Sequence, residues 1–318
     1  YGKDGFGLIN GDSVRAVKHL EKYHGKDIFL TEALTIEAKN EITGAKKEGK
    51  PFFLYMSHYA VHSPFQPDKR FIDNYASSNK SDRAKAFAAL IEGVDKSLGD
   101  IVQHVEELGL GEETLILFLG DNGSDAPLEM DNMYGSSFPL KGKKGMCWEG
   151  GMRVPFIASW VTPNDQAPGQ QKTPIISNEI QIQMGTIMDL FPTLCKVAGI
   201  DIPDGHVLDG FALQGQLKGK ETLQRDELFL NHFPHDHRSS YFSSLVESDW
   251  KIVYHYQIHG TPRYELYDLQ HDPYETSNLA SKNPAQLRIM MKALQREMDD
   301  ADALPPEFSQ EPLQLIIP

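Results

Sequence analysis

The 318-residue sequence is poor in cysteine and in positive charge, and it lacks a long apolar run. Cys147 and Cys195 form no Cys-x-x-Cys pair, so neither a disulfide framework nor a structural zinc site is expected. No stretch approaches the ~20 consecutive apolar residues that a membrane-spanning helix needs. The net charge is -14, with 31 Lys and Arg against 45 Asp and Glu, which argues against nucleic acid and membrane surfaces as partners. An anionic substrate would therefore need a local positive charge or a metal.

Three common catalytic motifs are also absent. The sequence contains no Gly-x-Ser-x-Gly elbow, no Walker loop and no Gly-x-Gly-x-x-Gly run, so serine-hydrolase chemistry and nucleotide binding lack support. The composition is 40% hydrophobic and 24% charged, which excludes a disordered or fibrous chain.

Helical patterns alternate with apolar runs over the first two thirds of the chain. Apolar residues at three-and-four spacing predict a helix over about 82–108, which Ser81 can cap and Gly109 can end. Other helical patterns and three runs typical of buried strands follow the same alternation: helices near 34–42 and 184–194, and strands at 51–57, 115–120 and 154–160. The predicted fold class is α/β, with a central, mostly parallel sheet sandwiched by helices.

The pattern changes after about residue 220. Four short strand-like runs are separated by turn-rich segments, and one helical pattern follows them: 227–233, 241–247, 250–256 and 263–269, then 284–298. We expect a smaller C-terminal antiparallel sheet subdomain with a helix. The predicted domains are therefore 1–219 and 220–318.

Polar clusters stand beside the predicted buried strands, where open α/β sheets bind ligands. Asp121 and Asn122 follow the run 115–120, and their oxygen donors suit Ca²⁺ or Mg²⁺. On spacing alone a plain turn is the favoured alternative, because Asp-Asn-Gly is a strong turn sequence after any strand. Three lysines interleaved with glycine precede the run 154–160 and would suit an oxyanion, although short lysine runs are commonly solvated loops: Lys141, Lys143 and Lys144.

Two histidine-containing segments complete the candidates. His62 could be a general acid or an anion ligand, with His58 competing for that role and a structural histidine as the alternative. His235, in the cluster 232–237, is a candidate for the rim of a substrate pocket. The spacing of that cluster does not match a zinc protease, and an exposed polar loop is the alternative.

In this order, the clusters resemble the sulfatase family of the alkaline phosphatase superfamily. The matching stretches are PFFLYMSHYAVHSPF, ALIEGVDKSLGDIVQHVEELGLGEETLILFLGDNGSD, PLKGKKGMCWEGGMRVPFIASW and ELYDLQHDPYETSNLA. The resemblance implies that Asp121 and Asn122 are two ligands of one divalent cation, calcium or else magnesium. It implies that Lys144 holds the sulfate and the leaving oxygen. His62 would contact the ester oxygen and protonate the leaving alcohol.

Asparagine at position 122 separates this pattern from zinc enzymes of the superfamily, which typically have Asp-His-Gly there. The sequence departs from sulfatases in lacking Cys/Ser-x-Pro-x-Arg, whose first residue becomes the formylglycine nucleophile, and in lacking Lys-x-His. We therefore expect formylglycine in an upstream segment of the same protein, and an inactive chain without it. By resemblance, the protein is periplasmic or secreted and acts on a sulfated small molecule or glycan.

Two other functions stay open from the sequence. One is a phosphatase or phosphodiesterase of the same superfamily, which would need more Asp and His ligands and a Ser or Thr nucleophile. The other is a non-catalytic relative that binds sulfated glycans.

Overall fold

The computed structural model describes residues 17–128, 137–219, 228–235, 241–257, 262–309 and 314–318. The chain divides into two compact units. The first contains Tyr1–Ile116 and Ala158–Pro174, and the second contains Leu117–Ile157 and Ile175–Pro318. The mixed α/β composition confirms the predicted fold class. The predicted boundary between residues 219 and 220 stays a prediction.

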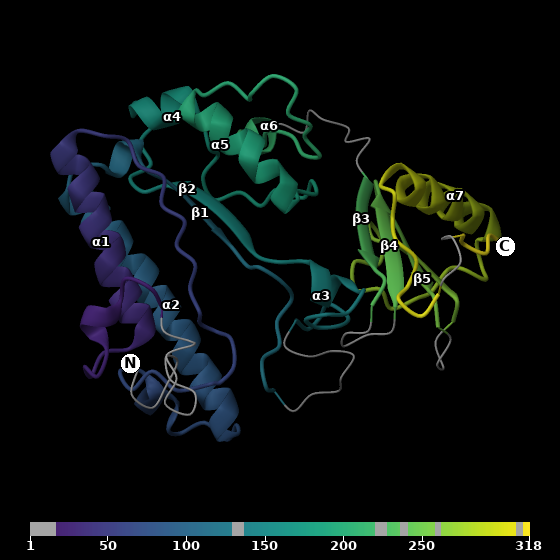
Figure 1. Ribbon diagram of the computed structural model, residues 1–318, viewed down its shortest axis with the longest axis horizontal. Coiled ribbons are helices and arrows are strands. Elements are labelled where there is room, and N and C mark those ends of the chain that lie inside the picture. The colour runs from purple at the N-terminus through teal and green to yellow at the C-terminus, as the bar shows by residue number, and fades with distance from the viewer. Residues whose placement is uncertain (1–16, 129–136, 220–227, 236–240, 258–261, 310–313) are drawn as a thin grey trace. The chain divides into compact units, whose positions relative to one another are not determined.

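Two long helices dominate the first unit: α1 is Leu30–Glu48 and α2 is Asp82–Glu107. They pack side by side (Figure 1). The Ser81 hydroxyl accepts a hydrogen bond from the Ala84 amide at 3.3 Å, which satisfies a backbone donor that the helix leaves unpaired. Both predicted helices are confirmed, including this cap. The described part of this unit also contains four shorter helices: Glu21–Tyr23, Ile72–Tyr75, Gly111–Glu113 and α4, Pro168–Lys172.

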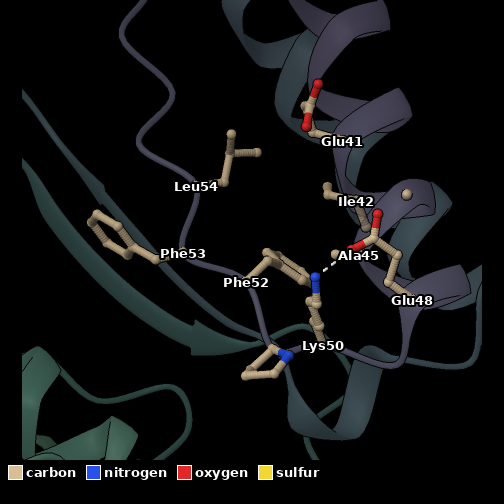
Figure 2. A pocket seen from close by; sticks show the side chains of 10 residues that line it. Glu41, Ile42, Ala45, Glu48, Lys50, Phe52, Phe53 and Leu54 are labelled. Atoms are coloured by element: carbon tan, nitrogen blue, oxygen red, sulfur yellow. Dashed lines mark hydrogen bonds and ion pairs between the residues drawn. The ribbon is translucent and has the colours of Figure 1, made fainter.

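The predicted strand at 51–57 is wrong, because the structure gives this segment no regular secondary structure. A strand forms only when its backbone groups pair with a neighbour, and no strand of the described chain pairs with this segment. Phe53 and Tyr55 are 75% and 79% exposed. Figure 2 shows the segment beside α1, with Phe52 on the helix side and Phe53 pointing away from it. A cavity of about 330 Å³ is lined by residues of α1 and by residues 50–54.

The other two predicted strands form. β1 is Leu115–Leu119 and β2 is Phe156–Trp160, and they pair as a two-stranded sheet. This pair is what the described chain forms of the predicted central sheet. The helix predicted near 184–194 is displaced: the 3-10 turn Ile187–Asp189 leads into α5, Leu190–Ala198. Asp189 and Thr186 form a capping box that begins this turn.

The C-terminal sheet is confirmed. Its four strands are antiparallel neighbours in chain order: β3, Leu228–Phe233; β4, Phe242–Glu247; β5, Trp250–His255; and β6, Tyr264–Asp268. The predicted helix is α7, Pro284–Asp300. Figure 1 shows α7 lying along this sheet.

Side chains alternate between the two faces of this sheet, as the strand period requires. Leu245, Ile252 and Leu266 are fully buried on one face, and they pack against α7. Phe242, Val253 and Tyr267 point to the other face, where Cys147 and Trp148 cover them. Cys147 and Trp148 belong to the loop 141–148, the lysine-rich loop, which precedes the short helix α3, Glu149–Met152. The sheet therefore lies between α7 and the lysine-rich loop.

Among the described residues, no helix is long and apolar enough to cross a membrane. The remaining short helix is α6, Gln214–Leu217.

Candidate anion and metal site

The turn that follows β1 packs tightly against the start of α3. The Gly123 amide donates a hydrogen bond to the Gly151 carbonyl at 3.0 Å. A Cβ atom built on Gly123 would lie 2.1 Å from the Gly150 carbonyl oxygen. Only glycine permits this approach of one backbone to the other. The Asp121–Asn122 turn is thus held against the glycine pair at 150 and 151.

The loop that carries Lys144 is held by the same turn. The Lys144 amide donates to the Ser124 carbonyl at 3.1 Å, and the Gly150 amide donates to the Lys141 carbonyl at 2.7 Å. A Cβ atom on Gly150 would meet the Gly142 carbonyl at 2.5 Å, so this part of the loop is also packed backbone against backbone. The structure therefore brings together three residues that the sequence analysis selected: Asp121, Asn122 and Lys144.

Lys141 and Lys144 differ in what surrounds their ammonium groups. Lys141 Nζ lies 3.0 Å from the Tyr267 hydroxyl, 3.4 Å from Glu265 Oε2 and 4.3 Å from the centre of the Trp148 ring. Within the described part of the chain, the Lys144 ammonium has no hydrogen-bond or ion-pair partner. Lys141 is consequently committed to the interior, whereas Lys144 retains its charge for a ligand.

Asp121 and Asn122 offer the donor set of a hard cation. The exposed Asp121 carboxylate has no hydrogen-bond or ion-pair partner among the residues that the structure describes. The half-buried Asn122 donates its amide nitrogen to the Gly123 carbonyl at 2.9 Å, which leaves the amide oxygen as an electron-pair donor. Carboxylate and amide oxygens suit calcium or magnesium, so these residues fit the expected ion. Calcium takes about six to eight oxygens, so two side chains do not complete its site. The described residues contain no cluster of three or more His, Cys, Asp or Glu arranged for a metal.

His62 lies in the first unit, and its side chain is exposed. Its Nδ1 is 2.8 Å from the carbonyl oxygen of Ser63, a contact that fixes the ring against its own backbone. The competing His58 is more enclosed, and burial lowers the pKa of its imidazole. A cavity of about 430 Å³ between α1 and residues 54–59 is lined in part by His58.

His235 lies in the second unit, just after β3, and is exposed. Its ring packs on Phe233 with centroids 4.6 Å apart. No hydrogen bond or ion pair among the described residues joins it to Asp121, Asn122 or Lys144. The part of its cluster after residue 235 lies outside the described residues. Its place at a pocket rim stays a prediction.

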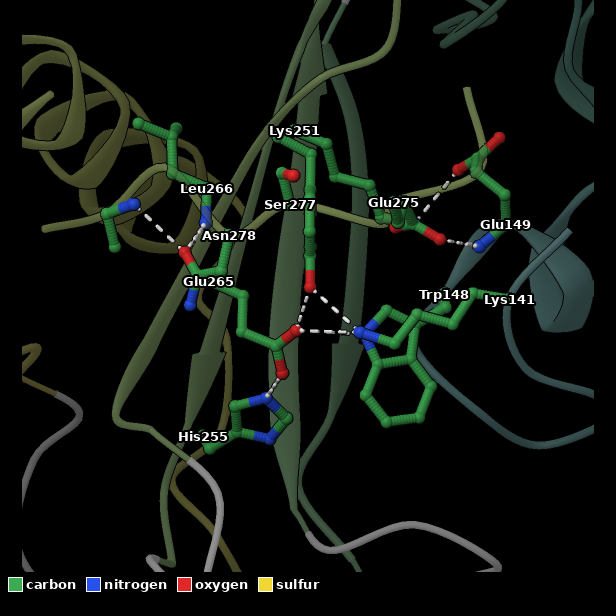
Figure 3. A network of polar contacts seen from close by, with 12 residues as sticks. Lys141, Trp148, Glu149, Lys251, His255, Glu265, Leu266, Glu275, Ser277 and Asn278 are labelled. Carbon is green, nitrogen blue, oxygen red and sulfur yellow. Dashed lines mark hydrogen bonds and ion pairs between the residues drawn. The ribbon is translucent and has the colours of Figure 1, made fainter. Parts of the chain in front are cut away.

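The face of the C-terminal sheet that meets the loop carries a polar network centred on Glu265 (Figure 3). Trp148 Nε1 donates to Glu265 Oε2 at 3.0 Å, His255 Nε2 lies 2.7 Å from Oε1, and the Tyr267 hydroxyl also donates to Oε2. Burial by itself would raise the pKa of Glu265, but these hydrogen bonds and the Lys141 ammonium lower it to about 2. Glu265 is therefore a fixed anion that binds the loop to the sheet.

A second buried cluster lies beside it. Lys251 is buried, and its Nζ lies 2.9 Å from Glu149 Oε1 and 2.8 Å from Glu275 Oε1. Burial opposes ionisation of Glu149, but Lys251 and then Arg153 hold the pKa of its carboxyl below the ordinary value. For Glu275, burial and the neighbouring Glu149 raise the pKa against the pull of Lys251. One lysine thus serves two carboxyl groups.

Sequence reasoning missed this framework. Glu149 stands in the Glu-Gly-Gly stretch that supported the resemblance, but it was given no role there. Lys251 and Glu265 each interrupt an otherwise apolar strand pattern. A charged residue in a strand whose two faces are both buried indicates a buried ion pair.

The described residues form an α/β protein in which the backbone of Lys144, a lysine with no polar side-chain partner among them, is bonded to the turn that carries the oxygen donors Asp121 and Asn122. Such groups suit a metal-assisted oxyanion site. Comparisons with known proteins narrow the class. The sequence model of the Sulfatase family matches residues 7–200, more than half of the chain. The model described as N-sulphoglucosamine sulphohydrolase, C-terminal, matches residues 142–303. The chain belongs to the sulfatase family.

Individual relatives agree with this assignment. The chain is 28% identical over 312 residues to steryl-sulfatase of Homo sapiens, covering 88% of this chain and 50% of that protein. It is 33% identical over 192 residues to N-acetylgalactosamine-6-sulfatase of Mus musculus, covering 60% of this chain and 33% of that protein. A crystal structure of Ps i-CgsB superposes with a TM-score of 0.71 at 25% identity, covering 94% of this chain and 58% of that one. The chain thus spans about half the length of steryl-sulfatase.

Proposed function

We propose that the protein to which this chain belongs hydrolyses sulfuric esters, with Asp121 and Asn122 holding a calcium ion and Lys144 holding the sulfate. The observation that carries the proposal is the pair of backbone hydrogen bonds, from Gly123 to Gly151 and from Lys144 to Ser124, which unite the two halves of this site. Membership of the sulfatase family supports the reaction type.

The chemistry of a sulfate ester suits these groups. When the bond between sulfur and the ester oxygen breaks, its electron pair goes to that oxygen, and negative charge grows on the leaving and peripheral oxygens. The Lys144 ammonium would stabilise this charge, as would any fixed cation placed there before the reaction. When bound, a divalent cation would act as a Lewis acid on the sulfate oxygens. His62 in its protonated form would pass a proton to the leaving alkoxide, releasing it as an alcohol.

The nucleophile of this proposal lies outside the 318 residues, as a formylglycine in an upstream segment. Two observations support this part. Neither Cys147 nor Cys195 is followed by x-Pro-x-Arg. Cys147 is also fully buried, and burial raises the pKa of its thiol, which disfavours the reactive thiolate.

We further propose a sulfated carbohydrate as the substrate and a periplasmic or secreted location. The substrate class is supported by relatives named for N-acetylgalactosamine 6-sulfate groups, and by the crystal structure of Ps i-CgsB in complex with k-i-k-neocarrahexaose. The location rests on family resemblance to bacterial sulfatases.

The test uses the whole protein, with release of inorganic sulfate as the readout. Expected results are turnover of p-nitrophenyl sulfate and of a sulfated galactose oligosaccharide, loss of turnover in EDTA, and its return with Ca²⁺. p-Nitrophenyl phosphate serves as the matched control. Faster release of phosphate than of sulfate would overturn the proposal in favour of a phosphatase. Calcium-dependent binding of the oligosaccharide with no turnover of any ester would assign a binding protein instead.

A further inference from the structure

The buried cluster of Lys251, Glu149 and Glu275 takes no part in the proposed reaction, yet it is attached to the loop that does. Lys251 is 1% exposed and lies near the start of β5, on the same face as Val253 and His255. Its ammonium contacts Glu149 of α3 and Glu275, which lies after β6. The three residues come from separate parts of the second unit, so the cluster connects the sheet to the loop.

The cluster holds the backbone of the loop as well as its side chains. Glu275 Oε2 accepts a hydrogen bond from the main-chain amide of Glu149 at 2.6 Å, while its Oε1 contacts Lys251. The first residue of α3 is thereby bound twice, through its amide and through its carboxylate. Figure 3 shows both contacts, with Glu275 between Lys251 and Glu149.

A short path leads from Glu149 to the anion site. The next two residues, Gly150 and Gly151, have backbone carbonyl and amide groups that contact the Asp121–Asn122 turn and the start of the lysine-rich loop. That turn in turn receives the Lys144 amide through Ser124. Displacement of Glu149 would therefore move Gly150 and Gly151. The separation between Lys144 and the Asp121–Asn122 turn would then change.

We propose that Lys251 is a positioning residue, which acts through Glu149 and Glu275 to hold Lys144 beside the Asp121–Asn122 turn. The inference rests on the proposed function. Lys251 lies on β5 with its ammonium enclosed by two carboxyl groups, so it does not itself meet substrate. Its contribution to the reaction reaches the ester only through the loop.

This role differs measurably from a contribution to general stability. A residue that only stabilises the fold would change the activity of the wild type and of a Lys144 variant by the same factor. A residue that acts through Lys144 would lose its effect once the Lys144 ammonium is removed, because the two act as a unit. A double-mutant cycle between Lys251 and Lys144 separates these cases.

The experiment uses the whole protein with p-nitrophenyl sulfate as the probe. We expect Lys251→Met to lower kcat by about 30-fold or more, with a smaller change in KM, as for a misplaced group that stabilises the transition state. Adding Lys251→Met to Lys144→Ala should change kcat by less than about threefold. Lys251→Arg, which keeps the charge, should recover part of the loss. Lys292→Met is the matched control, because Lys292 is exposed on α7.

Hydrogen–deuterium exchange supplies a readout that does not depend on activity. In Lys251→Met, the amides of Lys144 and Gly151 should exchange about tenfold faster or more, while those of Met290–Leu294 in α7 keep their wild-type rates. If Lys251→Met does not fold, Glu275→Gln replaces it, since the isosteric amide removes the charge with little change of volume.

The outcomes divide clearly. Multiplicative losses of kcat in the cycle, or unchanged exchange at Lys144 and Gly151, would overturn the positioning role even if the protein is an active sulfatase. A wild type that releases no sulfate would overturn the proposed function. Faster exchange confined to the loop would in that case still support the hold of Lys251 on the Lys144 loop.

Discussion

At the scale of single residues, the surroundings of each lysine decide its role. Lys141 and Lys144 are three positions apart and chemically identical. The first is enclosed by Glu265, Tyr267 and Trp148, and its charge is compensated inside the protein. The second has no partner among the described residues, so a ligand anion can use its charge fully. An ammonium that is already paired would offer little to an incoming sulfate.

Replacing Lys144 should therefore remove function without removing the fold. In the whole protein, Lys144→Ala should lower the rate of sulfate-ester hydrolysis by about 100-fold or more, as for the loss of one oxyanion-stabilising group. The matched control is Lys218→Ala, an exposed lysine of the same unit. The measurement is sulfate release under saturating substrate, with thermal unfolding in parallel. Near-wild-type turnover would remove Lys144 from the site.

Glu265 should make stability depend on pH in the acid range. Its pKa in the folded chain is about 2, below the ordinary value of 4.5, because hydrogen bonds and Lys141 favour the carboxylate despite its burial. A depressed folded pKa stabilises the fold above pH 4.5, and this stabilisation is lost as pH falls toward 2. The full effect is about 3 kcal/mol, since each pKa unit corresponds to about 1.4 kcal/mol.

The measurement compares unfolding of the wild type and of Glu265→Gln between pH 6 and pH 2.5. The variant should be less stable at pH 6, and the difference between the two proteins should shrink as the pH falls. The two proteins differ only at position 265, so the comparison isolates Glu265. Parallel stability curves across this range would refute the assignment.

At the scale of elements, the site depends on backbone packed against backbone. The turn after β1 can approach α3 only because position 123 is glycine, since a Cβ there would lie 2.1 Å from the Gly150 carbonyl oxygen. Gly150 and Gly151 allow the equally close packing of α3 against the preceding loop, where their Cβ atoms would lie 2.5 Å and 2.3 Å from the carbonyl oxygens of Gly142 and Met146. The alternation of side chains on β5 and β6 places two charged residues where they can bind the lysine-rich loop. Lys251 and Glu265 both point to the face opposite α7.

Gly123→Ala should test this packing directly. A methyl group 2.1 Å from the Gly150 carbonyl must push the turn and α3 apart, at a cost of about 1–3 kcal/mol in unfolding free energy. Sulfate-ester hydrolysis should fall as well, because the separation of Asp121 and Lys144 changes. Gly44→Ala in α1 is the control: nothing lies within 4 Å of its Cβ position, and alanine should stabilise the helix by about 0.5–1 kcal/mol. Equal effects of the two substitutions on stability would contradict the packing argument.

At the scale of the whole molecule, the chain carries one part of a proposed active site. The chain contains four of the residues proposed for the reaction: Asp121, Asn122, Lys144 and His62. It spans 50% of steryl-sulfatase and 48% of a sulfatase of Formosa agariphila. Segment 51–57 exposes Phe53 and Tyr55 in place of a paired strand. The proposed nucleophile belongs to an upstream segment.

The purified 318-residue chain should accordingly show no turnover of p-nitrophenyl sulfate under conditions in which the whole protein is active. The reason is chemical, because Lys144 and a bound cation stabilise charge but supply no group that attacks sulfur. The check is a sulfate-release assay of both proteins at equal concentration, with calcium present. Robust activity of the 318-residue chain would mean that the nucleophile lies within it.

Local patterns in the sequence were sufficient for most elements. The helix at Asp82–Glu107, its Ser81 cap, and all four strands of the C-terminal sheet follow from residue spacing, since periodicity and capping act between near neighbours. The strand predicted at 51–57 failed for the opposite reason. Its composition is that of a buried strand, but strand formation needs a partner that composition does not supply.

In the site, too, some features follow from local sequence and others only from tertiary contacts. Asp121, Asn122 and Lys144 could be selected from the sequence because oxygen donors and ammonium groups beside glycine have recognisable chemistry. That Lys144 rather than Lys141 lacks a polar partner among the described residues was decided only by the tertiary structure. Lys141 meets Glu265 and Tyr267 from more than a hundred residues away. Contacts of that separation depend on how strand faces and loops pack together, and no local pattern contains them.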